Sequence, residues 1–471
     1  MVFSSLEFIF IFLPIFLIVY FLAPPNFKNL TLFVGSLLFY AAGTLDHPFY
    51  ILLIAASVLV NFLIANTLES RKKGRKGWFL LGIFYNFGWL FLFKYADFLF
   101  SGINTLFDTL LPQPPFRLPE VHLLLPAGIS FYTFQAVSYL CDVYWEKCRA
   151  EKSFVKFGTY ICMFPQLIAG PIVTYTSVRE SLYHRSCSME NLVHGIQLFI
   201  IGLGSKVLLA NRIGALWTNL STIGYDSIST PLAWMGLAAF TFQIYFDFLG
   251  YSLMAVGLGN MMGFQLPRNF NEPYRSLSMT EFWRRWHITL GAWFRDYIYI
   301  PLGGSRNGMI RTIFNLLIVW LFTGLWHGAG LNFLLWGFVL FLLIAIEKLG
   351  LKNILDRYPV IGHLYMTACI PLTWMLFAIT DLKQLGIFIG RLFHRKPLDG
   401  AVIFQHDYLK YGKEYGILLV VCILFCTGIP RILYSKIKDS PAEVIFLLAV
   451  FWASFYCLYI GLNDPFLYFR F

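Results

Sequence analysis

The sequence predicts an all-α, polytopic membrane protein, and its composition and its long apolar runs support this. Of the 471 residues, 58% are hydrophobic and only 13% are charged, and the mean hydropathy is +0.66. A soluble domain has roughly 45–50% apolar and about 25% charged residues. Apolar runs long enough to cross about 30 Å of hydrocarbon recur along the chain. The polar surface is therefore too small for a water-soluble globule.

The N-terminal stretch MVFSSLEFIFIFLPIFLIVYFLAPP predicts a retained first membrane helix near residues 8–23. It lacks the basic start and the small-residue cleavage site of a secretion signal, and Glu7 precedes its apolar run. The next spans are predicted near 30–43 and 48–66.

The loop Glu69–Gly77, ESRKKGRKG, carries five Lys or Arg residues. The positive-inside rule makes this loop cytoplasmic, and counting back through three spans places the N-terminus outside. The net charge of +11 collects in such short loops beside apolar runs. This distribution predicts contact with membrane lipid and no nucleic-acid partner.

Further apolar runs predict the remaining membrane segments, near 78–93, 122–145, 154–174, 192–210, 231–262, 312–346, 361–380, 415–436 and 442–460. The 312–346 run predicts two helices broken around Gly324 to Gly330. Pro165, Gly170 and Pro171 would interrupt any regular helix in FPQLIAGPIV, and broken backbone at membrane depth requires protein or a watery cavity around it. We expect about 11 spans plus re-entrant pieces, in one domain covering residues 1–471.

Residues 265–311 depart from this apolar pattern. The stretch from Arg268 to Arg311 contains seven arginines but only three acidic residues, and polar residues are interspersed with aromatic ones. The segment is too polar to span and too aromatic for a flexible linker. We expect an interfacial or re-entrant segment on the cytoplasmic side.

Within that segment, EFWRRWHITLGAWFRDY contains His287 close to several charged residues. On a helix, Glu281 reaches Arg284 and Arg285 at spacings of three and four residues. One interpretation is an amphipathic surface helix whose arginines touch lipid phosphates. The alternative is that His287 and its neighbours form part of a site.

A second histidine, His327, lies inside the apolar stretch FTGLWHGAGLNFLLWG. Ionisable groups in membrane segments are costly and usually face a cavity or a partner. A neutral imidazole that donates one hydrogen bond to a backbone carbonyl is the structural alternative. Glycines 324, 328 and 330 leave room for a substrate or another backbone to approach, and Asn332 could orient a ring or a ligand.

A third polar group, QIYFDFLGYS, contains Gln243, Tyr245 and Asp247. It could form an interhelical hydrogen-bond network or the wall of a cavity. No metal site is predicted, because the eight cysteines are scattered without a CxxC pair and no acidic cluster or HExxH motif occurs. GLGSK, ending at Lys206, resembles a phosphate-binding loop only superficially.

A histidine in a dry site near aromatic and hydroxyl groups suits general-base catalysis. The imidazole takes a proton from a hydroxyl group as that hydroxyl attacks an acyl carbon. Acyl transfer is therefore the reaction class that the residues themselves favour.

Several motifs together resemble the membrane-bound O-acyltransferase family, in its alginate O-acetyltransferase branch. They are NFNEPYRSLSMTEFWRRWHITLGAWFRDYIYIPLGGSRNG, QIYFDF with GYS, GLWHGAGLNFLLWG, the N-terminal MVFSSLEFIFIFLP, LLPAGISFYTFQAVSYLCDVY and FPQLIAGPIV. The resemblance covers most of the chain and weakens after about residue 345, with the motif-bearing core at about 122–345. It implies a ring of about 11 tilted transmembrane helices, with re-entrant or interfacial helices, around a thinned core.

The resemblance also implies roles. His327 matches the catalytic base, and His287 matches the second motif histidine. We take as candidate substrate or cavity residues Trp326, Asn332, Asp247, Gln243, Tyr245, Asn271, Glu281, Arg284 and Arg285. No bound cofactor is expected, and acetyl-CoA, or an acyl carrier, is the expected acyl donor. The acceptor is an exported polysaccharide such as alginate, peptidoglycan or another glycan, reached through an extracytoplasmic SGNH-hydrolase-like acetyltransferase. The implied location is the bacterial inner membrane.

Two positions depart from the family motif, and two other functions remain open. Leu249 and Leu253 replace a serine and an aspartate of DFSGYSDMAIG, so a role for that acid does not carry over. One rival is a D-alanyl transferase acting on teichoic acids. The other is a non-enzymatic transporter in which His327 couples to protons, although the paired broken repeats typical of transporters are not apparent.

Overall fold

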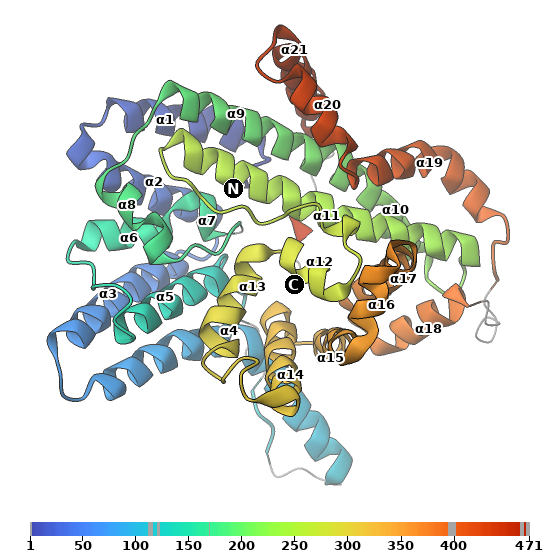
Figure 1. The fold of residues 1–471 in the computed structure, drawn as a ribbon, viewed down its shortest axis with the longest axis horizontal. Coiled ribbons are helices and arrows are strands. Elements are labelled where there is room, and N and C mark those ends of the chain that lie inside the picture. The colour runs from blue at the N-terminus through green and yellow to red at the C-terminus, as the bar shows by residue number, and fades with distance from the viewer. Residues whose placement is uncertain are drawn as a thin grey trace. The chain divides into compact units, whose positions relative to one another are not determined.

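The computed structural model describes residues 2–111, 116–119, 123–168, 170–393, 402–461 and 466–467. The secondary structure of these residues is helical, with no strand in the described ranges. Contacts divide the chain into two compact units, drawn as a ribbon in Figure 1. The expectation of a single membrane domain, with a motif-bearing core at about 122–345, stays a prediction.

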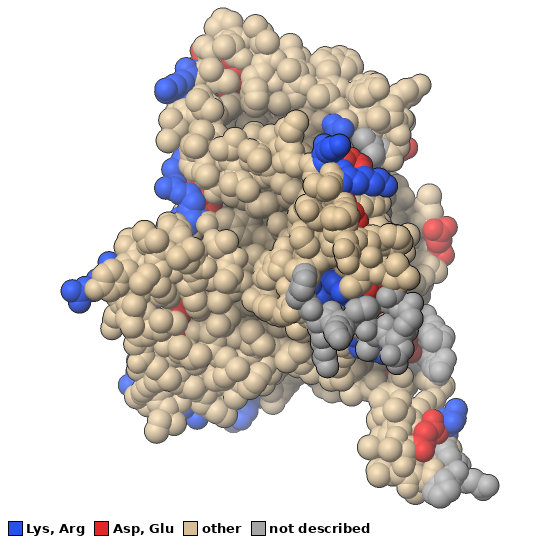
Figure 2. Space-filling view, turned by 90° about the vertical axis from the view of Figure 1, so that its right-hand side faces the viewer, with Lys and Arg blue, Asp and Glu red and all other residues tan. Residues whose placement is uncertain are grey.

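The described part of the chain contains eight helices long and apolar enough to cross a membrane, or up to nine if the bent pair α19 and α20 counts as one span. Large apolar side chains are widely exposed on these helices. Figure 2 shows a face on which uncharged residues dominate and Lys and Arg gather in only a few places. This confirms an all-α, multi-pass membrane protein. The expected total of about 11 spans stays a prediction, since α2 and α5 have only 16 residues each.

The first unit contains most of the chain up to Asn191. Its helices are η1 (Phe8–Phe12), α1 (Leu13–Leu22), η2 (Pro25–Phe27), α2 (Lys28–Gly43), α3 (Phe49–Ser70), α4 (Arg75–Leu110), α5 (Ile129–Tyr144), α6 (Phe154–Cys162), α7 (Phe164–Leu167) and α8 (Tyr175–Tyr183). Helix α5 is buried from Ile129 to Val143, including its polar residues Ser130, Thr133, Gln135, Ser138 and Asp142. It forms the core of this unit.

Polar side chains link the outer helices of the first unit. Asn61 on α3 and Asn86 on α4 exchange two hydrogen bonds of 3.1 and 2.7 Å, and both side chains are buried. Such reciprocal amide pairs hold membrane helices together. The predicted interruption in FPQLIAGPIV is confirmed: α6 and the single-turn α7 are followed by non-helical residues 170–174, and residue 169 lies outside the described ranges.

The second unit contains residues 192–261 and most of the chain after Pro267. Its helices are α9 (Met189–Gly204, from Leu192 on), η3 (Ser205–Ala210), α10 (Asn211–Ile223), α11 (Thr230–Met261), η4 (Pro273–Arg275), α12 (Met279–Arg285), α13 (Ile288–Phe294), η5 (Arg295–Tyr299), α14 (Gly308–His327), α15 (Leu331–Ile346), η6 (Glu347–Leu351), α16 (Lys352–Arg357), α17 (Pro359–Ala378), α18 (Leu382–Leu392), α19 (Asp407–Phe425), α20 (Ile429–Ile437) and α21 (Pro441–Tyr459).

Helix α11 is the core of the second unit, and most of its residues are buried. It crosses α9 at two pairs of glycines. A Cβ built on Gly202 would lie 2.6 Å from the Gly250 carbonyl oxygen, and one on Gly257 would lie 2.5 Å from that of Gly195. Because no real Cβ fits there, the two backbones approach as closely as glycine permits.

The polar segment 265–311 folds into short helices that pack within the second unit. Ser278 caps α12 by accepting from the Glu281 N–H at 3.2 Å, and Glu281 accepts from the Leu277 N–H at 2.8 Å. This is a capping arrangement typical of a helix start. The chain then turns at His287, so α12 and α13 are two helices rather than the single amphipathic helix considered above. Met279 and Phe282 are fully buried.

Helices α14 and α15 form a hairpin, visible as neighbouring ribbons in Figure 1. Among the described residues, no other pair of helices packs together as extensively as α14 and α15. The break falls at Gly328–Gly330, which confirms the predicted interruption of the 312–346 run. His327 is therefore the last residue of α14, at the turn of the hairpin.

Candidate active site

His327 is buried among aromatic rings at the end of α14. Its relative exposure is 9%. The ring centroids of Trp326, Trp336 and Phe377 lie 4.9, 5.1 and 5.2 Å from that of His327, each close to edge-on. The imidazole is thus held in a fixed orientation in a dry environment.

The glycines around His327 serve the contact between α14 and α15. A Cβ on Gly324 would lie 2.4 Å from the Phe333 carbonyl oxygen, and one on Gly328 would lie 2.1 Å from the Phe333 ring. Of the two partners that the sequence suggested, the structure places another helix rather than a substrate against these glycines. The close packing fixes the position of His327 relative to α15.

Asn332 links two helices close to His327. It is fully buried on α15, and its Nδ2 donates to the carbonyl oxygens of Leu376 at 3.2 Å and Phe377 at 3.4 Å, at the end of α17. The Phe377 ring packs on His327. Asn332 therefore ties α15 to the end of α17, and its expected role in orienting a ring or a ligand stays a prediction.

A small cavity of about 30 Å³ lies beside His327. This is about the volume that one water molecule occupies. Apart from His327 and Asp247, the described residues that line it are apolar or aromatic: Ile244, Phe248, Trp283, Trp286, Trp374, Phe377, Phe466 and Leu467. Asp247, one of the polar residues in QIYFDF, thus lies on a cavity wall together with His327.

Asp247 also belongs to a buried ion pair. Its Oδ1 lies 2.5 Å from Lys206 Nζ, and both side chains are at most 3% exposed. Its Oδ2 accepts from the Leu467 N–H at 2.8 Å. The lysine of GLGSK is therefore a counter-ion of the cavity wall. This role was not predicted from the sequence. A lysine inside the 192–210 apolar run could have indicated it, because charged residues in membrane segments usually pair with a residue of opposite charge.

His287 sits in a chain reversal held by Asn269. Its backbone is left-handed, with φ +43° and ψ +53°, at the N-terminal cap of α13. The Asn269 backbone oxygen accepts from the Ile288 N–H at 3.0 Å. The Asn269 Oδ1 accepts from the Thr289 N–H at 3.3 Å and from its hydroxyl at 3.0 Å. From the sequence, Asn271 was named as a candidate site residue and Asn269 was not.

The same contacts determine the tautomer of His287. Its Nδ1 lies 3.0 Å from Asn269 Oδ1, and that atom is an oxygen because it accepts from a backbone N–H. Nδ1 therefore carries the proton and donates it, leaving the lone pair on Nε2. Nε2 is buried and has no hydrogen-bond partner among the described residues. Burial lowers the pKa of His287 to about 3, so the ring is neutral.

Trp326 connects the two histidines. Its ring centroid lies 4.9 Å from that of His327 and 6.1 Å from that of His287. His287 also meets Phe248, a cavity residue, edge-on at 4.7 Å. His287 thus lies behind the cavity wall, while His327 faces the cavity itself.

The remaining predicted residues fall into two groups. Gln243 and Tyr245 are buried on α11, where Tyr245 packs on Trp286 at 5.9 Å and Gln243 faces Gly214 on α10. The others are less buried: Glu281 pairs with Arg285 at 2.7 Å, and Asn271 and Arg284 are exposed. Neither group lines the cavity.

No group of His, Cys, Asp or Glu residues with metal-binding geometry occurs among the described residues. What the site offers is a fixed imidazole in an aromatic cavity, a buried carboxylate on the same wall, and a second, neutral imidazole behind it. This arrangement can take a proton from a hydroxyl group in a medium that excludes water.

Comparison with known proteins matches residues 148–354 to the membrane-bound O-acyltransferase family. The chain is similar to the "Probable alginate O-acetylase AlgI" of Azotobacter vinelandii, at 39% identity over 100% of both chains. It is similar to the "Peptidoglycan O-acetyltransferase" of Helicobacter pylori, at 33% identity over 100% of this chain and 98% of the relative. The matched residues include both histidines of the site.

A third relative has lower identity. The "Teichoic acid D-alanyltransferase" of Bacillus subtilis is 27% identical over 58% of this chain and 69% of its own length. The similarity to the two O-acetylating proteins is thus both higher and more complete.

Proposed function

The chain belongs to the membrane-bound O-acyltransferase family, and from this premise we propose that it passes acetyl groups from a cytoplasmic thioester across the membrane to an exported polysaccharide. It is an acyltransferase and a multi-pass membrane protein. Its full-length relatives are named for alginate and for peptidoglycan O-acetylation, and these names support an exported or cell-surface polysaccharide as the acceptor.

His327 is the catalytic base in this proposal. Its imidazole takes the proton of an attacking hydroxyl as the new C–O bond forms at the acetyl carbon. The C–S bond of the thioester breaks, and the proton passes to the departing thiolate. The hydroxyl belongs either to the final acceptor or to a group that carries the acetyl transiently. The observation that carries the proposal is that, among the described residues lining the cavity, His327 and Asp247 are the ionisable ones.

His287 is a positioning residue in this scheme. It reaches the cavity through Trp326 and Phe248, whose rings it contacts. Its tautomer is fixed by Asn269, so it keeps these rings in place without taking up a proton. Loss of His287 should therefore weaken transfer severely without the complete loss expected at His327.

The donor and the partner are further parts of the proposal. Acetyl-CoA is the expected donor, and no resident cofactor is required by the general-base route. An extracytoplasmic SGNH-hydrolase-like acetyltransferase would receive the acetyl group and pass it to the polysaccharide. The resemblance to the alginate branch supports this route and a location in the bacterial inner membrane.

Transfer of D-alanine to teichoic acid is the rival within the family. It is disfavoured because the D-alanyl relative matches only 58% of this chain, whereas the O-acetylating relatives match all of it. Mass analysis of ester groups on cell-surface polymers separates acetyl from alanyl directly.

Replacing His327 by alanine tests the assignment in cells. General-base catalysis contributes about 10²- to 10⁴-fold to a rate, so we expect the acetyl content of the polysaccharide to fall at least about a hundredfold in His327→Ala. The acetyl content is measured by mass spectrometry, and the amount of membrane-inserted protein is measured alongside.

His363→Ala is the matched control, because His363 is an exposed histidine on α17 away from the cavity. We expect it to keep the acetyl content of the unmodified protein. An unchanged acetyl content in His327→Ala, with the protein normally inserted, would refute the role of His327.

A further inference from the structure

A second hollow, unrelated to the His327 cavity, lies in the first unit. Its volume is about 570 Å³, within the range of small-molecule sites. Six cationic side chains line it, and we call it the basic hollow: Arg71, Lys72, Arg75, Lys147, Arg149 and Arg179. Among the described residues, two carboxylates, Glu69 and Glu146, share the lining.

The cations of the basic hollow come from separate parts of the chain. Arg71 and Lys72 lie in the turn between α3 and α4, Arg149 lies in the loop after α5, and Arg179 lies on α8. The positive-inside rule explains a basic loop at 69–77. It does not explain why side chains from three segments line one hollow.

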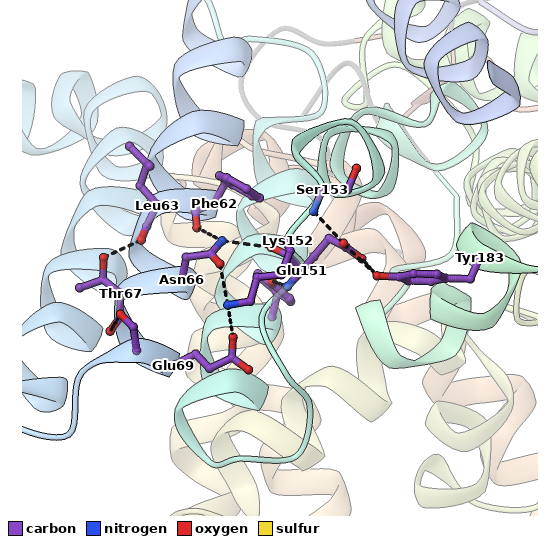
Figure 3. Close-up of polar contacts among 11 residues, drawn as sticks. Phe62, Leu63, Asn66, Thr67, Glu69, Glu151, Lys152, Ser153 and Tyr183 are labelled. Atoms are coloured by element: carbon purple, nitrogen blue, oxygen red, sulfur yellow. Dashed lines mark hydrogen bonds and ion pairs between the residues drawn. The ribbon is translucent and has the colours of Figure 1, made fainter. Parts of the chain in front are cut away.

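The walls of the basic hollow are joined by a buried carboxylate, Glu151, which is 2% exposed. It accepts hydrogen bonds from the hydroxyls of Tyr175 at 2.7 Å and Tyr183 at 2.9 Å, both on α8, and from the Ser153 N–H at 2.8 Å. Figure 3 shows this carboxylate pointing toward Tyr183. The loop that carries Arg149 is thus fixed to the helix that carries Arg179.

Two further contacts fix the loop to α3 and α4. Lys152 donates to Asn66 Oδ1 at 3.0 Å and pairs with Glu69, as Figure 3 shows. Arg75 pairs with Glu146 and donates to the Tyr144 carbonyl oxygen at 3.1 Å. Both carboxylates of the hollow are therefore already engaged by cations.

Lys147 lies 3.7 Å from Asp142 Oδ1 and is paired as well, but the other four cations of the hollow have no such partner among the described residues. Among the described residues, Arg71, Lys72, Arg149 and Arg179 form no ion pair, although Arg71 also lies over the Trp78 ring. A pre-formed hollow with several uncompensated cations attracts a multiply charged anion. The guanidinium group of arginine can donate two parallel hydrogen bonds to the oxygens of a phosphate group, and a phosphate carries more charge than a carboxylate.

We propose that the basic hollow binds a phosphate-bearing anion. The phosphate belongs either to the headgroup of an anionic phospholipid or to a free phosphorylated compound. The inference goes beyond the proposed function, because it uses neither His327 nor any residue of its cavity.

The test uses the full-length protein and one probe for each source. Binding of inorganic pyrophosphate in phosphatidylcholine nanodiscs is measured by titration calorimetry. Retention of phosphatidylglycerol relative to phosphatidylcholine in micelles is measured by native mass spectrometry. We expect at least one probe to bind, and to bind more weakly as salt is added.

Two double variants decide whether the hollow is responsible. Arg149→Gln with Arg179→Gln removes two cations of the hollow. Lys73→Gln with Lys76→Gln is the matched control, because these exposed lysines belong to the basic loop but do not line the hollow. We expect the first variant to lower affinity for the bound probe about tenfold or more, and the control to lower it less than about twofold.

Each outcome bears on the proposal. Loss confined to the pyrophosphate arm assigns a free phosphorylated ligand, and loss confined to the phosphatidylglycerol arm assigns a lipid headgroup. Equal weakening in both variants would mean a general attraction of the positive surface and would overturn the proposal. Binding of neither probe by the unmodified protein would overturn it as well.

Discussion

The imidazole of His287 is kept neutral by burial, and Asn269 fixes which of its nitrogens carries the proton. The ring is 2% exposed, and its pKa falls to about 3. A charged ring at this position would lose its hydration, and this cost disfavours the protonated form. The residue thus acts as a fixed hydrogen-bond donor in the described fold.

This burial makes stability depend on pH. A histidine in the unfolded chain has a pKa of about 6.5. Below that value the unfolded state binds a proton that the folded state excludes, so the free energy of unfolding decreases as pH falls from about 6.5 toward 3. The loss at pH 5 is about 2 kcal/mol from this residue. We expect His287→Gln to lose less thermal stability between pH 7.5 and pH 5 than the unmodified protein.

Thermal unfolding of the purified protein in detergent at the two pH values measures this difference. His184→Gln serves as the control, because His184 is exposed at the end of α8, and it should lose as much stability as the unmodified protein. Identical acid sensitivity in His287→Gln and the unmodified protein would contradict the buried neutral state.

At this scale the sequence could identify ionisable residues but not all their partners. His327 and Asp247 stood out because each is polar in an apolar run, and the structure places both on one cavity. Asn269 was missed because Asn269 and Asn271 are equivalent in NFN until the chain reversal at His287 is known. Lys206 was missed because its partner lies 41 residues away, on a helix whose register against η3 no local pattern specifies.

At the scale of elements, the α14–α15 hairpin determines where His327 lies. Gly324 lies on α14, one turn before His327, and packs against the Phe333 backbone of α15. Gly337 lies on α15 and packs against the Trp320 backbone of α14. A side chain at either position forces the helices apart, since backbone atoms cannot move away as a flexible side chain can.

We therefore expect Gly324→Ala to reduce acetyl transfer strongly, because the new Cβ would lie 2.4 Å from the Phe333 carbonyl oxygen and would displace the end of α14. We also expect a lower unfolding temperature, since overpacking costs about 1–3 kcal/mol. Acetyl content and thermal unfolding are measured on the same preparations.

Gly386→Ala on α18 is the matched control, because nothing lies within 4 Å of its added Cβ. Alanine is up to about 1 kcal/mol better than glycine inside a helix, so this variant should be at least as stable as the unmodified protein and as active. A Gly324→Ala protein with unchanged activity would show that the hairpin does not position the site.

The elements could be predicted where glycine and proline interrupt apolar runs. The break at Gly328–Gly330 and the interruption after α7 were both expected from such residues. The separate helices of segment 265–311 were not predicted in the same way. The chain reversal between them depends on contacts of His287 with Asn269 and Phe248, which are distant in the sequence. Only packing within the second unit determines that α12 ends where His287 reverses the chain.

At the scale of the whole molecule, composition was sufficient for the fold class. Each unit is organised around a helix that is buried on nearly all sides, α5 in the first and α11 in the second. Their sequences predicted membrane segments but did not predict which helices would surround them. That arrangement depends on close contacts such as the glycine pairs of α9 and α11.

The central claim is that His327 drives transfer of an acetyl group from a thioester to a polysaccharide hydroxyl. Membrane vesicles of the host cell that contain the full-length protein supply the acceptor, and labelled acetyl-CoA is added on the cytoplasmic side. We predict labelled ester in the polysaccharide and an equal amount of released CoA thiol, both reduced at least about a hundredfold in His327→Ala. Undiminished label transfer by a correctly inserted His327→Ala protein would contradict the account.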